Sequence, residues 1–110
     1  MEKVVKFLYE DKRIEPGHRI FPDAKAADKG PVYSTSGAAK FFGWTASYIR
    51  HLDIEGTISL SREPGSRRTF NLADLEDLSY QLVESDLLDH EKHRNVLNAI
   101  YSLARVWRIV

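Results

Sequence analysis

The feature that most constrains the fold is the short stretch Gly43-Trp44-Thr45, which separates two segments with helical signals. Glycine suits the left-handed backbone position that follows a helix. Threonine is a favoured N-cap because its hydroxyl accepts a hydrogen bond from an unpaired backbone N–H at the start of the next helix. The sequence therefore predicts two helices joined by a very tight turn, so that they must pack against each other.

The first of these helices is expected to begin at its N-cap Ser34 and to end at Phe42. The second is expected to run from Ala46 to about Glu55, where Gly56 ends it. At about 100° per residue, Ile49 and Leu52 fall on the buried side, with Tyr48 near its edge. The opposite side of this helix carries Ser47, Arg50, His51 and Ile54.

A hairpin and a third helix are predicted to follow. The hairpin consists of a strand over 57–62, a turn over 63–66 with Pro64-Gly65 at its tip, and a return strand over 67–70. Phe70 should anchor it to the core, and Asn71 should cap a helix that ends near Glu84. Four leucines recur at helical spacing on this third helix, at Leu72, Leu75, Leu78 and Leu82.

The flanking segments give weaker signals. Residues 2–12 show helical spacing, whereas 13–32 contain Pro16-Gly17 and Gly30-Pro31 and are expected to be irregular. Four apolar residues of that arm are expected to pin it to the core, at Ile14, Ile20, Phe21 and Val32. A long helix is predicted from about Leu87 to Arg108, with a broad apolar stripe. The stripe residues expected to contact the arm or a second subunit are Leu97, Ile100, Tyr101, Ala104 and Trp107.

The predicted fold class is therefore mainly α with a small β-hairpin wing. It is a winged helix-turn-helix with flanking N- and C-terminal helices. We divide the chain into the N-terminal helix and irregular arm (1–32), the winged helix-turn-helix (33–84) and the C-terminal helix (85–110).

Composition narrows the function classes. The chain has 16 basic and 16 acidic residues among 110, so it lacks the basic excess of a non-specific nucleic-acid binder. The charge is nonetheless uneven: residues 33–70 are net basic, 71–93 are strongly acidic, and 94–110 hold three arginines and no acid. There is no cysteine and no apolar run long enough for a membrane span, so we expect a cytoplasmic protein without contact to membranes.

The run from Tyr33 to Leu75 resembles the DNA-binding domain of the MerR family and its small relatives among phage excisionases. The matching residues are Tyr33-Ser34, Ala39-Lys40-Phe41-Phe42-Gly43, Thr45, Ile49-Arg50, Gly56-Thr57-Ile58, Gly65-Ser66-Arg67-Arg68, Phe70-Asn71 and Asp74-Leu75. The resemblance implies that helix 45–55 reads the major groove of duplex DNA and that the wing 57–70 contacts the backbone or minor groove. The residues that it and the exposed pattern assign to DNA are Lys40, Thr45, Ser47, Tyr48, Arg50, His51, Arg62, Ser66, Arg67 and Arg68.

Three departures from the family pattern matter. A basic residue usual early in the recognition helix is Ser47 here, and a frequent aromatic pair is His51-Leu52, and both changes weaken the expected DNA affinity. The family's long dimerising coiled coil and effector-binding domain have no counterpart in this sequence, so no small-molecule effector is expected.

Each of these residues can also be explained by a structural role without a ligand. Arg50 could pair with Glu55 or Asp53 on the protein surface, and Lys40 could simply complement the helix dipole. His90 and His93 have a spacing that can hold zinc, but without a third ligand nearby they are better interpreted as a solvated helix face. The acidic residues Asp74, Glu76 and Asp77 are interpreted as helix surface, and no catalytic arrangement, cofactor or metal is expected.

The sequence thus predicts a DNA-binding protein, either a phage or bacterial transcriptional regulator or an excisionase-type DNA-bending recombination factor. Because one copy would neutralise only three or four phosphates, useful affinity predicts a homodimer or cooperative array. A third hypothesis is a protein-interaction module that keeps the winged fold and has lost DNA binding. The neutral charge, Ser47 and the acidic third helix favour that alternative.

Overall fold

The computed structural model describes residues 20–21, 24–60 and 69–109. This part of the chain is mainly helical with a small two-stranded antiparallel sheet. In chain order the elements are the 3₁₀ helix η1 (Ala24–Ala27), strand β1 (Val32–Ser34), helices α2 (Thr35–Lys40) and α3 (Ala46–Ile54), strand β2 (Thr69–Asn71), and helices α4 (Leu72–Glu84) and α5 (His90–Val106). The helix expected over 2–12 and the hairpin turn expected over 63–66 lie outside the described residues.

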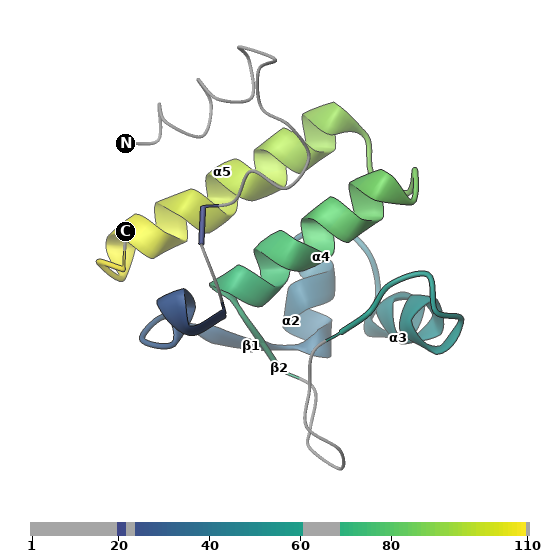
Figure 1. Ribbon diagram of the computed structural model, residues 1–110, viewed down its shortest axis with the longest axis horizontal. Coiled ribbons are helices and arrows are strands. Elements are labelled where there is room, and N and C mark those ends of the chain that lie inside the picture. The colour runs from purple at the N-terminus through teal and green to yellow at the C-terminus, as the bar shows by residue number, and fades with distance from the viewer. Residues whose placement is uncertain (1–19, 22–23, 61–68, 110) are drawn as a thin grey trace.

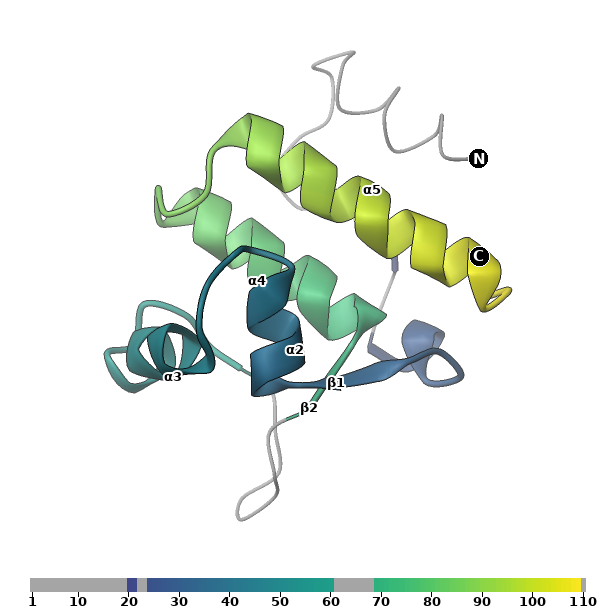
Figure 2. The ribbon, with the colours of Figure 1, turned by 180° about the vertical axis from the view of Figure 1, so that it is seen from behind.

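Helix α4 occupies the middle of the structure. It runs antiparallel to α5 on one side, while α2 crosses it and α3 lies farther out (Figures 1 and 2). The sheet lies at the beginning of α4, and η1 lies near the end of α5. The predicted leucines Leu72, Leu75, Leu78 and Leu82 are all fully buried in one core cluster that also contains Phe42, Ile49 and Phe70. None of the described helices is both long and apolar enough to cross a bilayer.

The strand prediction is wrong in two places. Residues 57–60 form no strand, although the sequence predicts one over 57–62, and Val32–Ser34 form a strand that the sequence does not predict. Among the described residues β2 pairs with β1, with Tyr33 opposite Phe70, and the rest of the predicted hairpin (61–68) lies outside them. Val32 is 59% exposed and does not pin the arm, whereas Phe21 is buried as expected.

A side chain takes the place of a strand partner beside residues 57–60. The Gln81 amide of α4 accepts a hydrogen bond from the Ser59 N–H at 2.7 Å and donates one to the Ser59 carbonyl at 2.9 Å. Asp77 fixes the amide, since Gln81 Nε2 also donates to Asp77 Oδ2 at 2.7 Å. Because both backbone groups of Ser59 are satisfied by Gln81, they are not available to a β ladder.

The predicted helix starts are confirmed. The side chains of Ser34, Thr45 and Asn71 each accept a hydrogen bond from the backbone N–H three residues later. Asn71 forms a full capping box with Asp74, whose carboxylate accepts from the Asn71 N–H at 3.0 Å. Burial raises the pKa of the Asp74 carboxyl above its ordinary value, with smaller contributions from Asp77 and Asp28 and an opposing one from the Asn71 hydrogen bond.

Helices α2, α3, α4 and α5 all end in the same type of backbone turn. After each helix a residue with positive φ reverses the chain, and the next N–H donates back to a carbonyl five residues earlier. Two of these residues are the predicted glycines, Gly43 (φ 73°) and Gly56 (φ 79°). The other two are Asp86 (φ 58°) and Arg108 (φ 57°), for which the left-handed conformation costs about 1 kcal/mol.

Glu76 is not surface, contrary to the sequence interpretation. It is 1% exposed, and its carboxylate accepts hydrogen bonds from the backbone N–H groups of Ile20 and, at 3.0 Å, of Phe21. A buried carboxylate is tolerated only when it is hydrogen-bonded. The arm therefore satisfies Glu76, and Glu76 in turn holds the arm on α4.

His93 is not on a solvated face either. It is 2% exposed, its ring packs edge-on against Tyr80 at 4.7 Å, and its Nε2 lies 3.0 Å from Ser79 Oγ. Since Ser79 donates its one hydroxyl hydrogen to the Glu76 carbonyl at 2.7 Å, the His93 contact requires a proton on Nε2. Ser79 is 0% exposed, so this serine–histidine pair is sealed from solvent and is a packing contact between α4 and α5.

The buried carboxylate generates a prediction. Glu76→Gln leaves one oxygen to accept two backbone N–H groups and turns an NH₂ donor toward one of them. We expect the free energy of unfolding to fall by about 2 kcal/mol and the melting temperature to fall by roughly 10 °C, as measured by circular dichroism. Glu84→Gln is the matched control, because Glu84 is exposed on the same helix and should change stability by less than about 0.5 kcal/mol. Equal melting temperatures for the two variants would contradict this account of the arm.

Candidate functional site

The solvent-facing side of α3 is the site that the sequence singles out. Ile49 and Leu52 are buried at 0% and 4% exposure, and Tyr48 lies at the edge at 36%, as the periodicity predicts. The remaining face is exposed and comprises Ser47, Arg50, His51, Ile54 and Glu55. The turn after α2 fixes this orientation, because Gly43 takes the left-handed conformation and Thr45 caps α3 by accepting from the Tyr48 N–H at 3.3 Å.

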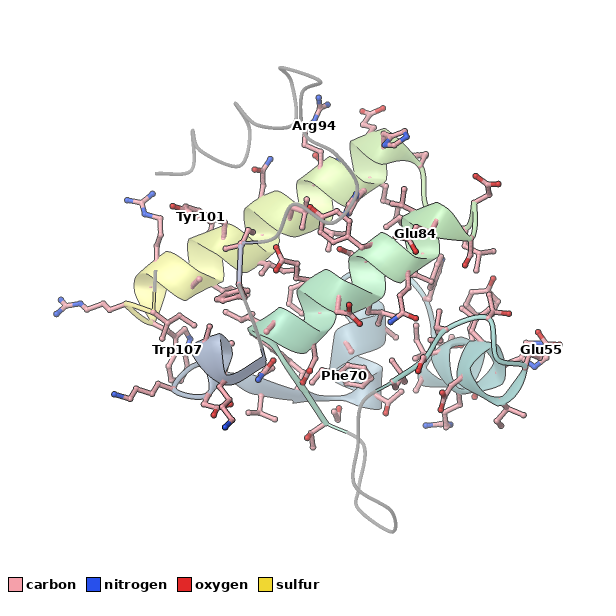
Figure 3. The ribbon with its side chains drawn as sticks, viewed as in Figure 1. Glu55, Phe70, Glu84, Arg94, Tyr101 and Trp107 are labelled. Atoms are coloured by element: carbon pink, nitrogen blue, oxygen red, sulfur yellow. The ribbon has the colours of Figure 1, made fainter. Side chains whose placement is uncertain are left out.

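The ionisable side chains on this face are Arg50, His51 and Glu55. His51 Nε2 lies 3.1 Å from Glu55 Oε1, one helical turn along α3. Figure 3 shows Glu55 at the outer end of the molecule, where α3 ends. Arg50 is exposed, and no ion pair joins it to any residue within the described ranges. The alternative in which Glu55 neutralises Arg50 is therefore not what the structure shows, since Glu55 pairs with His51 instead.

An aromatic stack lies at the beginning of α3. The Trp44 ring meets Tyr48 edge-on at 4.9 Å and Phe42 at 5.6 Å. Lys92 from α5 reaches this stack, with its Nζ 5.9 Å from the centre of the Trp44 ring. That ammonium also lies 3.7 Å from the position that a Cβ on Gly43 would take.

Lys92 is a residue that sequence reasoning missed. It lies in the acidic stretch 71–93 and far from the turn along the chain, so no local signal connects it with Trp44. Only the packing of α5 against α4 brings its charge to the N-terminal end of α3, where the helix dipole is also positive. Lys40, which the sequence does assign to the site, is exposed at the end of α2.

Four predicted site residues, Arg62, Ser66, Arg67 and Arg68, lie outside the described residues. The structure does describe both ends of the segment that carries them. Ser59 is held by Gln81 before it, and Thr69 pairs with Ser34 after it. The segment therefore begins beside α4 and returns to the sheet next to the start of α2.

The predicted contact residues of the C-terminal helix divide into two groups. Leu97, Ile100, Tyr101 and Ala104 are at most 6% exposed. Ile100 and Ala104 belong to the main core, whereas Leu97 and Tyr101 join Tyr80 in a second cluster against which Ile20 packs. Trp107 alone of the five stays 49% exposed. The helix thus packs mainly on α4, a contact that the sequence analysis did not anticipate.

No group of three His, Asp or Glu side chains in the described part of the chain is arranged to hold a metal ion. His90 is exposed and His93 is buried, so the two do not share a face open to solvent. Comparison of the chain with protein-family models, curated proteins and solved structures gives no match.

The exposed face of α3 is rich in hydrogen-bond donors. A guanidinium offers five N–H groups, serine and threonine hydroxyls donate and accept, and imidazole donates from at least one nitrogen. Acceptor groups on DNA base edges and phosphate oxygens match such a set. The face also carries an exposed isoleucine and one carboxylate, which DNA does not require.

Proposed function

We propose that this chain is a winged helix-turn-helix protein that binds duplex DNA without catalysing a reaction. In this proposal α3 enters the major groove, and the segment between Ser59 and Thr69 acts as the wing on the backbone or minor groove. The observation that carries the proposal is the exposed face of α3, where Arg50 lies beside Ser47 and His51 and forms no ion pair with any residue that the structure describes. An unpaired arginine on the second helix of a tight helix pair is suited to read guanine, whose O6 and N7 accept two hydrogen bonds.

The orientation of α3 supports this assignment. In helix-turn-helix proteins the N-terminal residues of the second helix contact the base edges. At that end α3 presents Thr45, Ser47 and Tyr48, all of which are exposed. Thr45 uses its oxygen to cap the helix and keeps its hydroxyl hydrogen for a phosphate or base acceptor.

Positive charge accumulates at the same end. Lys92 lies over Trp44, immediately before the cap residue, and adds to the positive end of the α3 dipole. Phosphates flanking the groove would meet this ammonium and, in the proposal, the exposed Lys40 at the end of α2. Two lysines and the wing arginines give only a few phosphate contacts for one copy.

Few contacts imply weak binding by a single copy, because affinity and its salt dependence scale with the number of neutralised phosphates. A functional complex therefore needs a dimer or a cooperative array on repeated half-sites, about one helical turn apart if the pair is two-fold symmetric. Both transcriptional control and assistance to a recombinase fit this arrangement. DNA bending and filament formation would favour the recombination role.

Substitution of Arg50 tests the proposal. A preferred sequence is first selected from a random pool of duplexes, and affinity is then measured by fluorescence anisotropy on that sequence and on a random duplex. Arg50→Ala should weaken binding to the selected sequence about tenfold or more and narrow its advantage over random DNA. Arg50→Lys keeps the charge but loses the guanidinium geometry that can donate two parallel hydrogen bonds. Compared with Arg50→Ala, it should therefore recover more of the affinity for the random duplex than of the affinity for the selected sequence. Identical affinities for all three proteins would place the DNA surface elsewhere.

Lys92 gives a second prediction. Lys92→Gln should weaken binding to selected and random duplexes by the same factor and reduce the slope of log affinity against log salt by about 1. Lys92→Arg should leave both quantities near those of the wild type, because a phosphate contact needs the charge rather than the ammonium shape. A loss confined to the selected sequence would mean that Lys92 does not contact phosphate.

A second candidate function, a protein-interaction module, is favoured by one observation. Ile54 is 82% exposed on α3, on the same face as the His51–Glu55 pair. An exposed branched side chain on a recognition surface is better suited to an apolar pocket of a protein partner than to a phosphate backbone.

Ile54→Arg separates the two functions. The added charge should leave DNA binding unchanged or strengthen it, because it places a cation beside the groove. The same change would place a charge in the apolar pocket of a protein partner and abolish that complex. A wild type and an Ile54→Arg variant that both fail to bind duplex DNA at low salt would favour the protein-interaction module and count against the DNA proposal.

A further inference from the structure

A second cationic surface lies at the end of α5, away from α3. The last turn of this helix exposes four residues in succession, Arg105, Val106, Trp107 and Arg108. Val106 and Trp107 are 75% and 49% exposed, although both are large apolar side chains. No acidic residue occurs anywhere in 94–110. The end of this helix therefore carries exposed positive and aromatic groups without a local countercharge.

Arg108 occupies a backbone position that normally selects glycine. Its φ is 57°, and the turn that it forms closes with the Ile109 N–H donating to the Ala104 carbonyl at 3.0 Å. A long side chain in this conformation is unfavourable. Retention of an exposed arginine at a strained position points to a function for its side chain.

The tail after Arg108 is docked on the arm. Gly30 lies close to Ile109, because a Cβ built on Gly30 would be 2.9 Å from Ile109 Cδ1. Lys29 and Arg108, both exposed, are the chain neighbours of these two residues, so their backbones lie in the same region of the surface. Lys25 is also exposed, on η1, and Figure 3 shows Trp107 beside that element.

We define the C-terminal basic surface as the exposed cations of η1, the turn after it and the end of α5, together with Trp107; the cations are Lys25, Lys29, Arg105 and Arg108. Asp28 is the one acidic residue among the described residues of these two segments, so the described side chains there have an excess of three positive charges. Arginine and lysine next to an exposed tryptophan suit a phosphate backbone, where the cations contact phosphates and the ring packs on sugar or base. We propose that this surface binds the phosphate backbone of duplex DNA, separately from α3.

The C-terminal basic surface lies far from the α3 surface and is distinct from it. The molecule measures 38 Å along its longest axis, and the end of α5 and α3 lie at opposite ends of that axis (Figure 1). Figure 3 shows the same separation between Trp107 and Glu55. The choice of duplex DNA as the polyanion rests on the proposed function, but the surface itself does not use α3 or the wing. It adds phosphate contacts that the α3 surface alone does not supply.

The test measures affinity for a random duplex by fluorescence anisotropy over a range of salt concentrations. The triple variant Lys29→Ala, Arg105→Ala, Arg108→Gly should bind at least about tenfold more weakly than the wild type, and its salt slope should be smaller by about 2 to 3. Arg94→Ala is the matched charge control, because Figure 3 shows Arg94 at the other end of α5. This control should stay close to the wild type.

The single variant Arg108→Gly should change thermal stability and DNA affinity in opposite directions. It relieves the left-handed strain and should raise the melting temperature by a few degrees, while it removes a phosphate contact and weakens DNA binding. Asp86→Gly makes the same backbone change after α4, where φ is 58°. It should raise the melting temperature without weakening DNA binding. A merely structural role for Arg108 would give two variants with equal DNA affinity.

The outcomes for the two surfaces are separable. If the triple variant binds and responds to salt like the wild type, the C-terminal surface is not a DNA surface, whatever Arg50→Ala does. If Arg50→Ala has no effect while the triple variant loses affinity, the proposed function of α3 fails and this inference stands. Loss in both, with a further loss when they are combined, supports two independent contacts. A wild type that does not bind duplex DNA at low salt overturns both.

Discussion

The burial of α4 on nearly all sides is the constraint on which the rest of the structure depends. Leucines on one side of this helix join the main core, and Ser79 and Tyr80 on another side meet His93 of α5. A helix surrounded in this way also encloses some of its polar side chains, Glu76 and Ser79. Each must therefore find a partner, and Glu76 finds one in the backbone of the arm. Packing of apolar residues thus dictates where the polar contacts form.

Those polar contacts position the surfaces that we propose for DNA. Gln81 of α4 holds Ser59, so the segment after α3 starts at a fixed place. The same packing places α5 antiparallel to α4. Lys92 therefore reaches Trp44 at one end of α5, and Ile109 reaches Gly30 at the other end. One helix therefore brings a cation to α3 with its first turn and forms a second cationic surface with its last. The arrangement of charge follows from the core rather than from local sequence.

Local signals predicted the helices well, and long-range contacts account for the failures. Ser34, Thr45 and Asn71 act within three residues, as do Gly43 and Gly56, so their roles can be recognised in the sequence. The pairing of β1 with β2 joins segments far apart in the chain, so no local signal could predict it, whereas most of the predicted hairpin lies outside the described residues. Glu76 looks like surface because its partners lie 55 and 56 residues away. The left-handed conformation of Arg108 could not be predicted, since a long side chain is rare at positive φ. Of the proposed site, the exposed face of α3 was predictable and the contribution of Lys92 was not.

The zero net charge of the chain does not argue against a polyanion partner, because charge acts locally in salt solution. The Debye length is about 8 Å at physiological ionic strength, whereas the molecule is 38 Å long. Acidic residues along α4, such as the exposed Asp77 and Glu84, are therefore screened from a phosphate that lies against the end of α5. The relevant quantity is the charge within one Debye length of each surface. By that measure the C-terminal basic surface is cationic although the protein is neutral, and the α3 surface depends on the few cations gathered around its N-terminal end.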